Sequence, residues 1–124
     1  MAKNLLVIDD EDLVVRSLAK FLLKEGYEVS VARSAQEALE KVAAADFDLI
    51  ISDVRMPDMD GIETIRRIRE ALARAQKKPV PEIFITGYAD IAKYQQAVAM
   101  RVAHYLYKPF DNVELLKVIK EALG

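Results

Sequence analysis

Acidic side chains follow two apolar stretches of the sequence, at the points where those stretches end. Asp9 and Asp10 come directly after residues 4–8, and Asp53 ends the stretch that contains residues 49–51. Three carboxylates in one cleft would repel one another by roughly 4 kcal/mol per pair at about 4 Å and an effective dielectric constant near 20. A bound cation would relieve this repulsion. Because all the candidate ligand atoms are oxygens, we expect a hard ion: Mg²⁺, with Mn²⁺ or Ca²⁺ as alternatives.

Asp53 is also a candidate nucleophile, because a carboxylate can attack phosphorus and form an aspartyl phosphate. That chemistry needs a metal ion and further groups around the equatorial phosphoryl oxygens. Lys108 would supply a positive charge, Thr86 a hydroxyl, and Gly87 a backbone N–H that a ligand can approach closely.

Each of these residues has an ordinary interpretation by itself. The acids after residue 8 would favour a helix N-terminus, Thr86 could bond a turn, and Lys108 could be a solvated lysine. All of them stand at the carboxyl ends of predicted strands, where open parallel sheets bind ligands, and this coincidence favours a functional site.

The elements that would position these residues alternate along the whole chain. Short apolar stretches predict strands at residues 4–8, 27–31, 49–51, 83–85 and 105–107. Helical spacing and capping boxes (Ser34 with Glu37, Asp111 with Glu114) predict helices at residues 11–25, 35–45, 61–73, 91–100 and 112–123. In the first helix the apolar positions 14, 18, 21 and 22 share one face, so Leu13 and Val15 are expected outside it.

This alternation predicts an α/β fold, a doubly wound five-stranded parallel sheet with helices on both faces. In the known order 2-1-3-4-5 the first and third strands are neighbours at the switch point, which would bring Asp9, Asp10 and Asp53 together. With 124 residues and no linker or repeat, residues 1–124 are expected to be a single domain without an output domain.

Composition excludes several classes. The absence of cysteine removes disulfides and thiolate metal sites. A net charge of -2 and basic residues without interleaved aromatics argue against nucleic-acid binding. Without a signal peptide or long apolar run, we expect no membrane association and a cytoplasmic location.

Four segments together resemble the receiver domain of response regulators, in the chemotaxis-regulator-like, flavodoxin-like form. They are residues 6–11 (LVIDDE), 53–61 (DVRMPDMDG), 86–87 (TG) and 105–110 (YLYKPF). The resemblance covers essentially the whole chain. It implies that Asp53 is the phosphoacceptor, that Asp10 and Asp53 bind Mg²⁺ with Asp9 acting through water, and that the backbone carbonyl of Arg55 completes the ligands.

The resemblance also implies a switch. Lys108 would contact the phosphoryl group, and the Lys108–Pro109 bond would be cis. Thr86 would move toward the phosphate and Tyr105 would rotate inward, which would reshape the face made by the fourth helix, fifth strand and fifth helix. The alternative for Tyr105 is a static, half-buried strand tyrosine.

As a receiver, the protein would be a phosphoaccepting switch and not an enzyme beyond its own phosphorylation and slow dephosphorylation. Its phosphodonor would be a histidine kinase or a histidine phosphotransfer protein. Its downstream target is unknown, and it would be a monomer or a phosphorylation-dependent dimer.

Other functions are disfavoured by particular residues. A phosphatase of the haloacid-dehalogenase type needs a second acid where Arg55 stands, and the acids after residue 8 would repel a flavin phosphate. A degenerate receiver would lack the intact set of acids, threonine and lysine.

Arg101 departs from the family pattern, and Tyr88 is expected to affect how fast the phosphoryl group is hydrolysed. Receivers usually have glycine where this chain has Arg101, which predicts either an unusual helix cap or a longer helix. Tyr88, two residues after Thr86, is predicted to hinder the attacking water and lengthen the phosphorylated lifetime.

Overall fold

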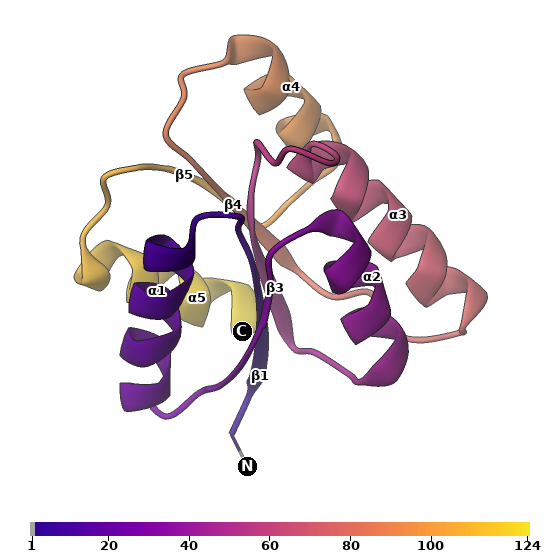
Figure 1. Ribbon diagram of the computed structural model, residues 1–124, viewed down its shortest axis with the longest axis horizontal. Coiled ribbons are helices and arrows are strands. Elements are labelled where there is room, and N and C mark those ends of the chain that lie inside the picture. The colour runs from indigo at the N-terminus through magenta and orange to yellow at the C-terminus, as the bar shows by residue number, and fades with distance from the viewer. Residues whose placement is uncertain (1) are drawn as a thin grey trace.

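A computed structural model describes residues 2–124, which contain five strands and five helices in strict alternation (Figure 1). This confirms the predicted element order. The bounds are β1 (Asn4–Ile8), α1 (Asp12–Lys24), β2 (Glu28–Ala32), α2 (Ala35–Ala44), β3 (Leu49–Asp53), α3 (Gly61–Arg74), β4 (Glu82–Thr86), α4 (Ile91–Ala99), β5 (His104–Tyr107) and α5 (Asn112–Leu123). No helix within this part of the chain is long and apolar enough to cross a membrane.

The five strands form one parallel sheet in the order β2-β1-β3-β4-β5, as predicted. Ile8 of β1 lies opposite Ser52 of β3, and Asp53 lies opposite Ile85 of β4. The carboxyl ends of β1, β3 and β4 therefore meet at one edge, which is the geometry that a shared site at these ends requires.

The sheet separates two apolar cores. Leu5 and Val7 of β1 pack with α1 and α5, whereas Leu6 and Ile8 pack on the other side with α2, α3 and α4. Figure 1 shows the same division, with α1 and α5 on one side of the strands and α2 and α3 on the other. Because both faces are covered, the central strands are apolar over most of their length, and this explains the apolar runs in the sequence.

Side-chain caps fix where the helices after the first begin. Ser34 Oγ accepts the N–H of Glu37 at 3.1 Å, and Asp111 Oδ1 accepts the N–H of Glu114 at 2.7 Å, which confirms both predicted cap residues. Asp60 and Asp90 cap α3 and α4 in the same way. Each cap of this kind stabilises its helix by about 1 kcal/mol.

The end of α4 decides between the two alternatives at Arg101. Arg101 has a φ of +59° and its N–H donates to Val98 O at 3.0 Å, so it forms a left-handed cap without glycine. In α1 the expectation for Leu13 is confirmed, since it is exposed, but the expectation for Val15 is wrong. Val15 is buried because the contact face of α1 includes it together with Leu18.

Candidate functional site

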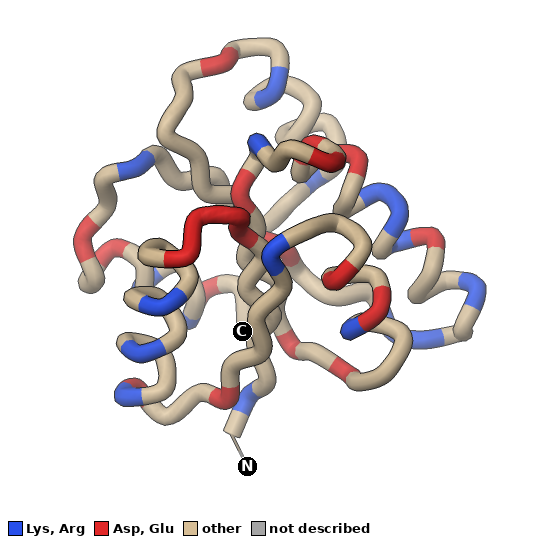
Figure 2. Tube along the Cα trace, in the orientation of Figure 1, with Lys and Arg blue, Asp and Glu red and all other residues tan. Residues whose placement is uncertain are grey.

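Three carboxylates converge where β1 and β3 end. Asp9 and Asp10 follow β1, Asp53 is the last residue of β3, and one oxygen from each lies within 4.8 Å of the others. Asp9 is 0% exposed and Asp53 is 5% exposed, whereas Asp10 faces solvent. The sequence-based expectation that these three residues meet is confirmed, and Figure 2 shows acidic residues gathered at this end of the strands.

Burial makes this cluster electrostatically strained. It raises the pKa of Asp53 from 3.8 to about 6, and the neighbouring charge of Asp9 adds to the effect. The three oxygen ligands and their excess negative charge fit a hard divalent cation, because such a cation would hold Asp53 in its ionised form. The acidic cluster can therefore bind a metal ion.

Lys108 follows β5 and lies directly beside the acidic cluster. Its Nζ is 3.3 Å from Asp9 Oδ2, 3.7 Å from Asp53 Oδ2 and 3.6 Å from Glu11 Oε1. Its backbone N–H donates to Thr86 O at 2.7 Å, which anchors it to the end of β4. Burial alone would lower the pKa of Lys108, but the carboxylates of Asp53 and Asp9 raise it, so the ammonium stays charged beside Asp53.

Thr86 and Gly87 occupy the third side of the site. The Thr86 side chain is buried at the end of β4, and its Oγ1 accepts the N–H of Tyr88 at 3.1 Å. A Cβ added to Gly87 would meet no atom within 4 Å, so open space lies beside its backbone. That this space admits a phosphoryl oxygen stays a prediction.

Gly61 positions the start of α3 against β3. It is the last residue of the segment 53–61, but the sequence alone indicated no role for it. Its N–H donates to Val54 O at 2.6 Å, and a Cβ at this position would collide with the backbone carbonyl of Asp53. Only glycine allows the start of α3 to approach β3 this closely. Its place directly after the cap residue Asp60 was the available sequence signal.

Arg55 and Tyr88 stand together beside the site. The Arg55 guanidinium carbon lies 4.1 Å from the centre of the Tyr88 ring, which is a cation–π contact, and Arg55 also pairs with Asp90. The backbone N–H of Arg55 donates to Asp53 Oδ1 at 3.4 Å. The role of its carbonyl as a metal ligand stays a prediction.

Tyr105 is half-buried on β5, where its ring belongs to an aromatic cluster. Its ring makes edge-to-face contacts with Tyr94, Tyr107 and Phe84 at centroid distances of 5.3, 5.4 and 6.2 Å. Within residues 2–124, its hydroxyl is buried without a hydrogen-bond partner, and burial raises its pKa to about 12. The following Lys108–Pro109 bond is cis, as expected.

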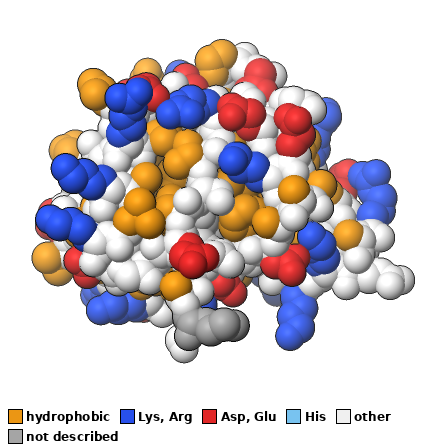
Figure 3. Space-filling model, turned by 60° about the horizontal axis from the view of Figure 1, so that its bottom comes forward, with side chains coloured by type: hydrophobic (Ala, Val, Ile, Leu, Met, Phe, Trp, Pro, Cys, Tyr) orange, Lys and Arg blue, Asp and Glu red, His pale blue; other side chains and the backbone are white. Residues whose placement is uncertain are grey.

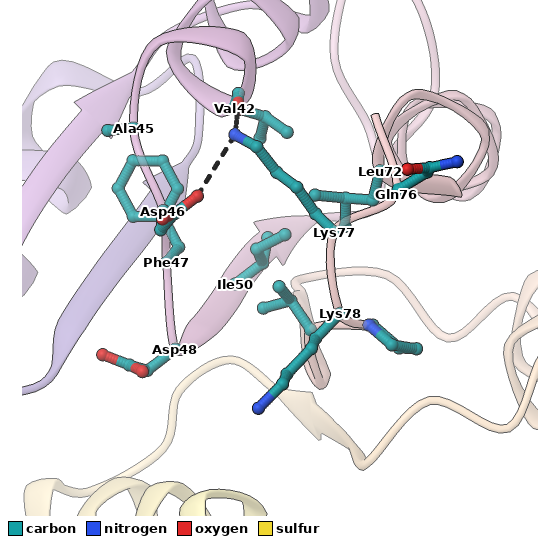
Figure 4. Close-up of a pocket in the computed structure, with 12 residues that line it drawn as sticks. Val42, Ala45, Asp46, Phe47, Asp48, Ile50, Leu72, Gln76, Lys77 and Lys78 are labelled. Atoms are coloured by element: carbon teal, nitrogen blue, oxygen red, sulfur yellow. Dashed lines mark hydrogen bonds and ion pairs between the residues drawn. The ribbon is translucent and has the colours of Figure 1, made fainter. Parts of the chain in front are cut away.

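A cavity of about 470 Å³ lies away from these residues, between the end of α2 and the loop after α3 (Figure 4). Lys77 spans it, donating to Val42 O at 3.2 Å and pairing with Asp46 at 3.1 Å. These partners satisfy the Lys77 ammonium. The cavity is therefore a weaker candidate site than the acidic cluster.

Figure 3, turned toward the lower end of the molecule, shows acidic, basic and apolar side chains interspersed, with no large area of one charge.

A family model described as the response regulator receiver domain matches residues 5–120. The chain belongs to this family. Receivers are signalling switches of two-component systems, are generally not classical enzymes, and work with a cognate kinase. The acidic pocket of Asp9, Asp10 and Asp53 is typical of their phosphoacceptor sites.

Individual relatives agree with this assignment. The transcriptional regulatory protein ResD of Bacillus subtilis is 36% identical over 97% of this receiver and 48% of its own length. The chemotaxis protein CheY4 of Vibrio cholerae is 34% identical with a TM-score of 0.88, covering 98% of this chain and 99% of CheY4. A response regulator of Burkholderia pseudomallei, solved with a phosphorylated aspartic acid, a calcium ion and citrate, is 32% identical with a TM-score of 0.81, covering 98% of this chain and 66% of that one.

The relatives also differ from this receiver in length. It spans 25% of AtoC of Escherichia coli, 57% of FixJ of Bradyrhizobium diazoefficiens and 48% of ResD. The similarity therefore concerns the receiver part of these regulators.

Proposed function

We propose that Asp53 of this receiver accepts a phosphoryl group from the phosphohistidine of a histidine kinase or a histidine phosphotransfer protein, in a Mg²⁺-dependent reaction. The observation that supports this most directly is the position of the Asp53 carboxylate. It is nearly buried, lies 3.7 Å from Lys108, and shares a cluster with two further acids. The phosphorylated aspartic acid and calcium ion of the related Burkholderia protein support the same chemistry.

In the proposed step, a carboxylate oxygen of Asp53 forms a bond to phosphorus while the bond from phosphorus to the imidazole nitrogen breaks. The electron pair of the broken bond stays on that nitrogen. Lys108 would hold one phosphoryl oxygen by its charge, and the Thr86 hydroxyl and Gly87 N–H would bind others.

The magnesium ion would be held by Asp10, Asp53 and the backbone carbonyl of Arg55, with Asp9 acting through water. When bound, the ion would supply positive charge for the phosphoryl oxygens, and Mn²⁺ would serve as an alternative.

The signal would leave through the face made by α4, β5 and α5. Thr86 would turn toward the phosphoryl group, and Tyr105 would respond to the space that it leaves. Exposed apolar side chains already lie on α4 and β5 of this face, namely Ile91, Tyr94, Val98 and Tyr107. This face would bind the downstream target or a second copy of the receiver.

Intact-mass measurement with a small-molecule phosphodonor and Mg²⁺ tests the proposal. We expect the parent protein to gain one phosphoryl group, and we expect no gain in Asp53→Asn or in the presence of a chelator. Asp46→Asn, which changes an exposed aspartate near the Lys77 cavity, is the matched control and should be phosphorylated like the parent. A parent protein that gains no mass with several donors would contradict the proposal.

A further inference from the structure

Two ion pairs cross between the loop that follows Asp53 and the first turn of α4. Arg55 of the loop pairs with Asp90, its Nη2 lying 3.7 Å from Asp90 Oδ2. Lys93 of α4 pairs in the opposite direction with Asp60, its Nζ lying 2.6 Å from Asp60 Oδ2. The loop and the helix are therefore joined at two points.

Each carboxylate in these pairs also caps a helix. Asp90 Oδ1 accepts the N–H of Lys93 at 3.1 Å, and Asp60 Oδ1 accepts the N–H of Glu63 at 2.8 Å. One oxygen of each carboxylate thus holds the N-terminus of its own helix, and the other oxygen holds the opposing segment. Loss of either pair would leave the carboxylate bound only to its own helix. The first turn of that helix, which depends on this carboxylate as its cap, would then be held less firmly.

The two pairs differ in strength. The Lys93–Asp60 contact is short, and although burial raises the pKa of Asp60, its hydrogen bonds from Lys93 and Glu63 hold it below the usual value. The Arg55–Asp90 contact is longer, and the two side chains are 53% and 32% exposed. A pair of this second kind contributes little stability and is readily exchanged for a better partner.

We propose that Arg55 is a charge-operated latch that holds the first turn of α4 in the unphosphorylated receiver and releases it when Asp53 is phosphorylated. This inference rests on the proposed function of Asp53. Arg55 is two residues from Asp53 and already donates its backbone N–H to that side chain. An acyl phosphate carries up to two negative charges where the carboxylate carries one, and its oxygens suit the forked guanidinium better than a single oxygen at 3.7 Å does.

The expected consequence is local. When Arg55 turns toward the phosphoryl group, Asp90 loses its ion-pair partner and Tyr88 loses the cation above its ring. The Lys93–Asp60 pair remains and keeps α4 joined to the loop that follows Asp53. Burial is the main cause of the raised pKa of Tyr105, and the charges of Asp90, Arg55 and Asp53 act on it as well, so the Tyr105 hydroxyl is electrostatically coupled to the latch.

Hydrogen exchange of the amides at residues 88–95, measured by mass spectrometry, tests the latch. In the unphosphorylated protein, Arg55→Ala should exchange about two- to fivefold faster than the parent, as expected for the loss of one exposed ion pair. Arg55→Lys should keep most of the protection. Arg67→Ala, which removes an exposed arginine of α3 without touching the latch, is the matched control and should leave these amides unchanged.

Phosphorylation then provides the second comparison. In the parent, exchange at residues 88–95 should rise by about the same factor once intact mass shows a phosphoryl group, and Arg55→Ala should show no further rise. An unphosphorylated Arg55→Ala protein that exchanges like the parent would overturn the latch whatever phosphorylation does.

A parent that gains the phosphoryl mass without faster exchange would overturn the latch alone. A parent that gains no mass would overturn both the proposed function and the trigger of the latch.

Discussion

Replacing Asp53 with asparagine should stabilise this receiver when no metal ion is present. The Asp53 side chain is only 7% exposed and lies beside the buried carboxylate of Asp9, so its negative charge is unfavourable in the folded state. Asparagine has nearly the same shape, keeps an oxygen that can accept the N–H of Arg55, and carries no charge. The substitution that abolishes the proposed function is therefore expected to raise the free energy of unfolding.

The size of this effect follows from the pKa of Asp53, which rises from 3.8 to about 6 on folding. A rise of about two units corresponds to about 3 kcal/mol at a pH above both values, since one unit is about 1.4 kcal/mol. Between these pKa values the folded state holds a proton that the unfolded state has lost. The stability of the parent therefore falls as pH rises through this window, and the Asp53→Asn protein should lack this fall.

Urea unfolding in the presence of a chelator measures the difference. We expect the free energy of unfolding of Asp53→Asn to exceed that of the parent by about 3 kcal/mol near pH 8 and by about 1 kcal/mol near pH 4.5. Glu40→Gln, which removes one charge from an exposed position on α2, should change stability by less than about 0.5 kcal/mol. Added Mg²⁺ should stabilise the parent and narrow the gap.

A variant no more stable than the parent near pH 8, or a gap that does not shrink toward pH 4.5, would refute the reasoning that burying the Asp53 charge beside Asp9 destabilises the folded state.

Three further substitutions test local features. Arg101→Gly should raise the free energy of unfolding by about 1 kcal/mol because Arg101 has a φ of +59°, whereas Arg67→Gly inside α3 should lower it by about 1 kcal/mol; equal urea midpoints for the two would contradict the assigned cap. Gly61→Ala should destabilise the fold by about 1–3 kcal/mol because its Cβ collides with the Asp53 carbonyl, and thermal unfolding unchanged from the parent would argue against this close approach. Tyr88→Ala should shorten the phosphorylated lifetime by about two- to fivefold, a change of less than about 1 kcal/mol in the barrier to hydrolysis, because the bulky ring no longer hinders the attacking water. Intact mass followed over time should show this, and phosphate loss no faster than in the parent would remove the shielding role of the ring.

Local sequence signals were enough to predict the parallel sheet and the acidic residues of the site. Apolar runs buried on both faces required a covered parallel sheet, and the capping residues Ser34 and Asp111 marked where two helices begin. These signals are local, because they depend on residues a few positions apart. Combined with the known strand order, they were enough to bring Asp9 and Asp53 together.

Contacts between segments that are distant in the sequence are visible only in the folded protein. Nothing in the local pattern shows that Lys93 pairs with Asp60, or that Arg69 donates from two guanidinium nitrogens to the nearly buried Glu82. The same is true of the Tyr105 hydroxyl, which has no hydrogen-bond partner within residues 2–124. Such contacts depend on how each helix is rotated and placed on the sheet, and helical periodicity fixes that rotation only to within about one residue, as the buried Val15 shows. The sequence therefore supplied the acids of the site, and the fold decided which charges surround them.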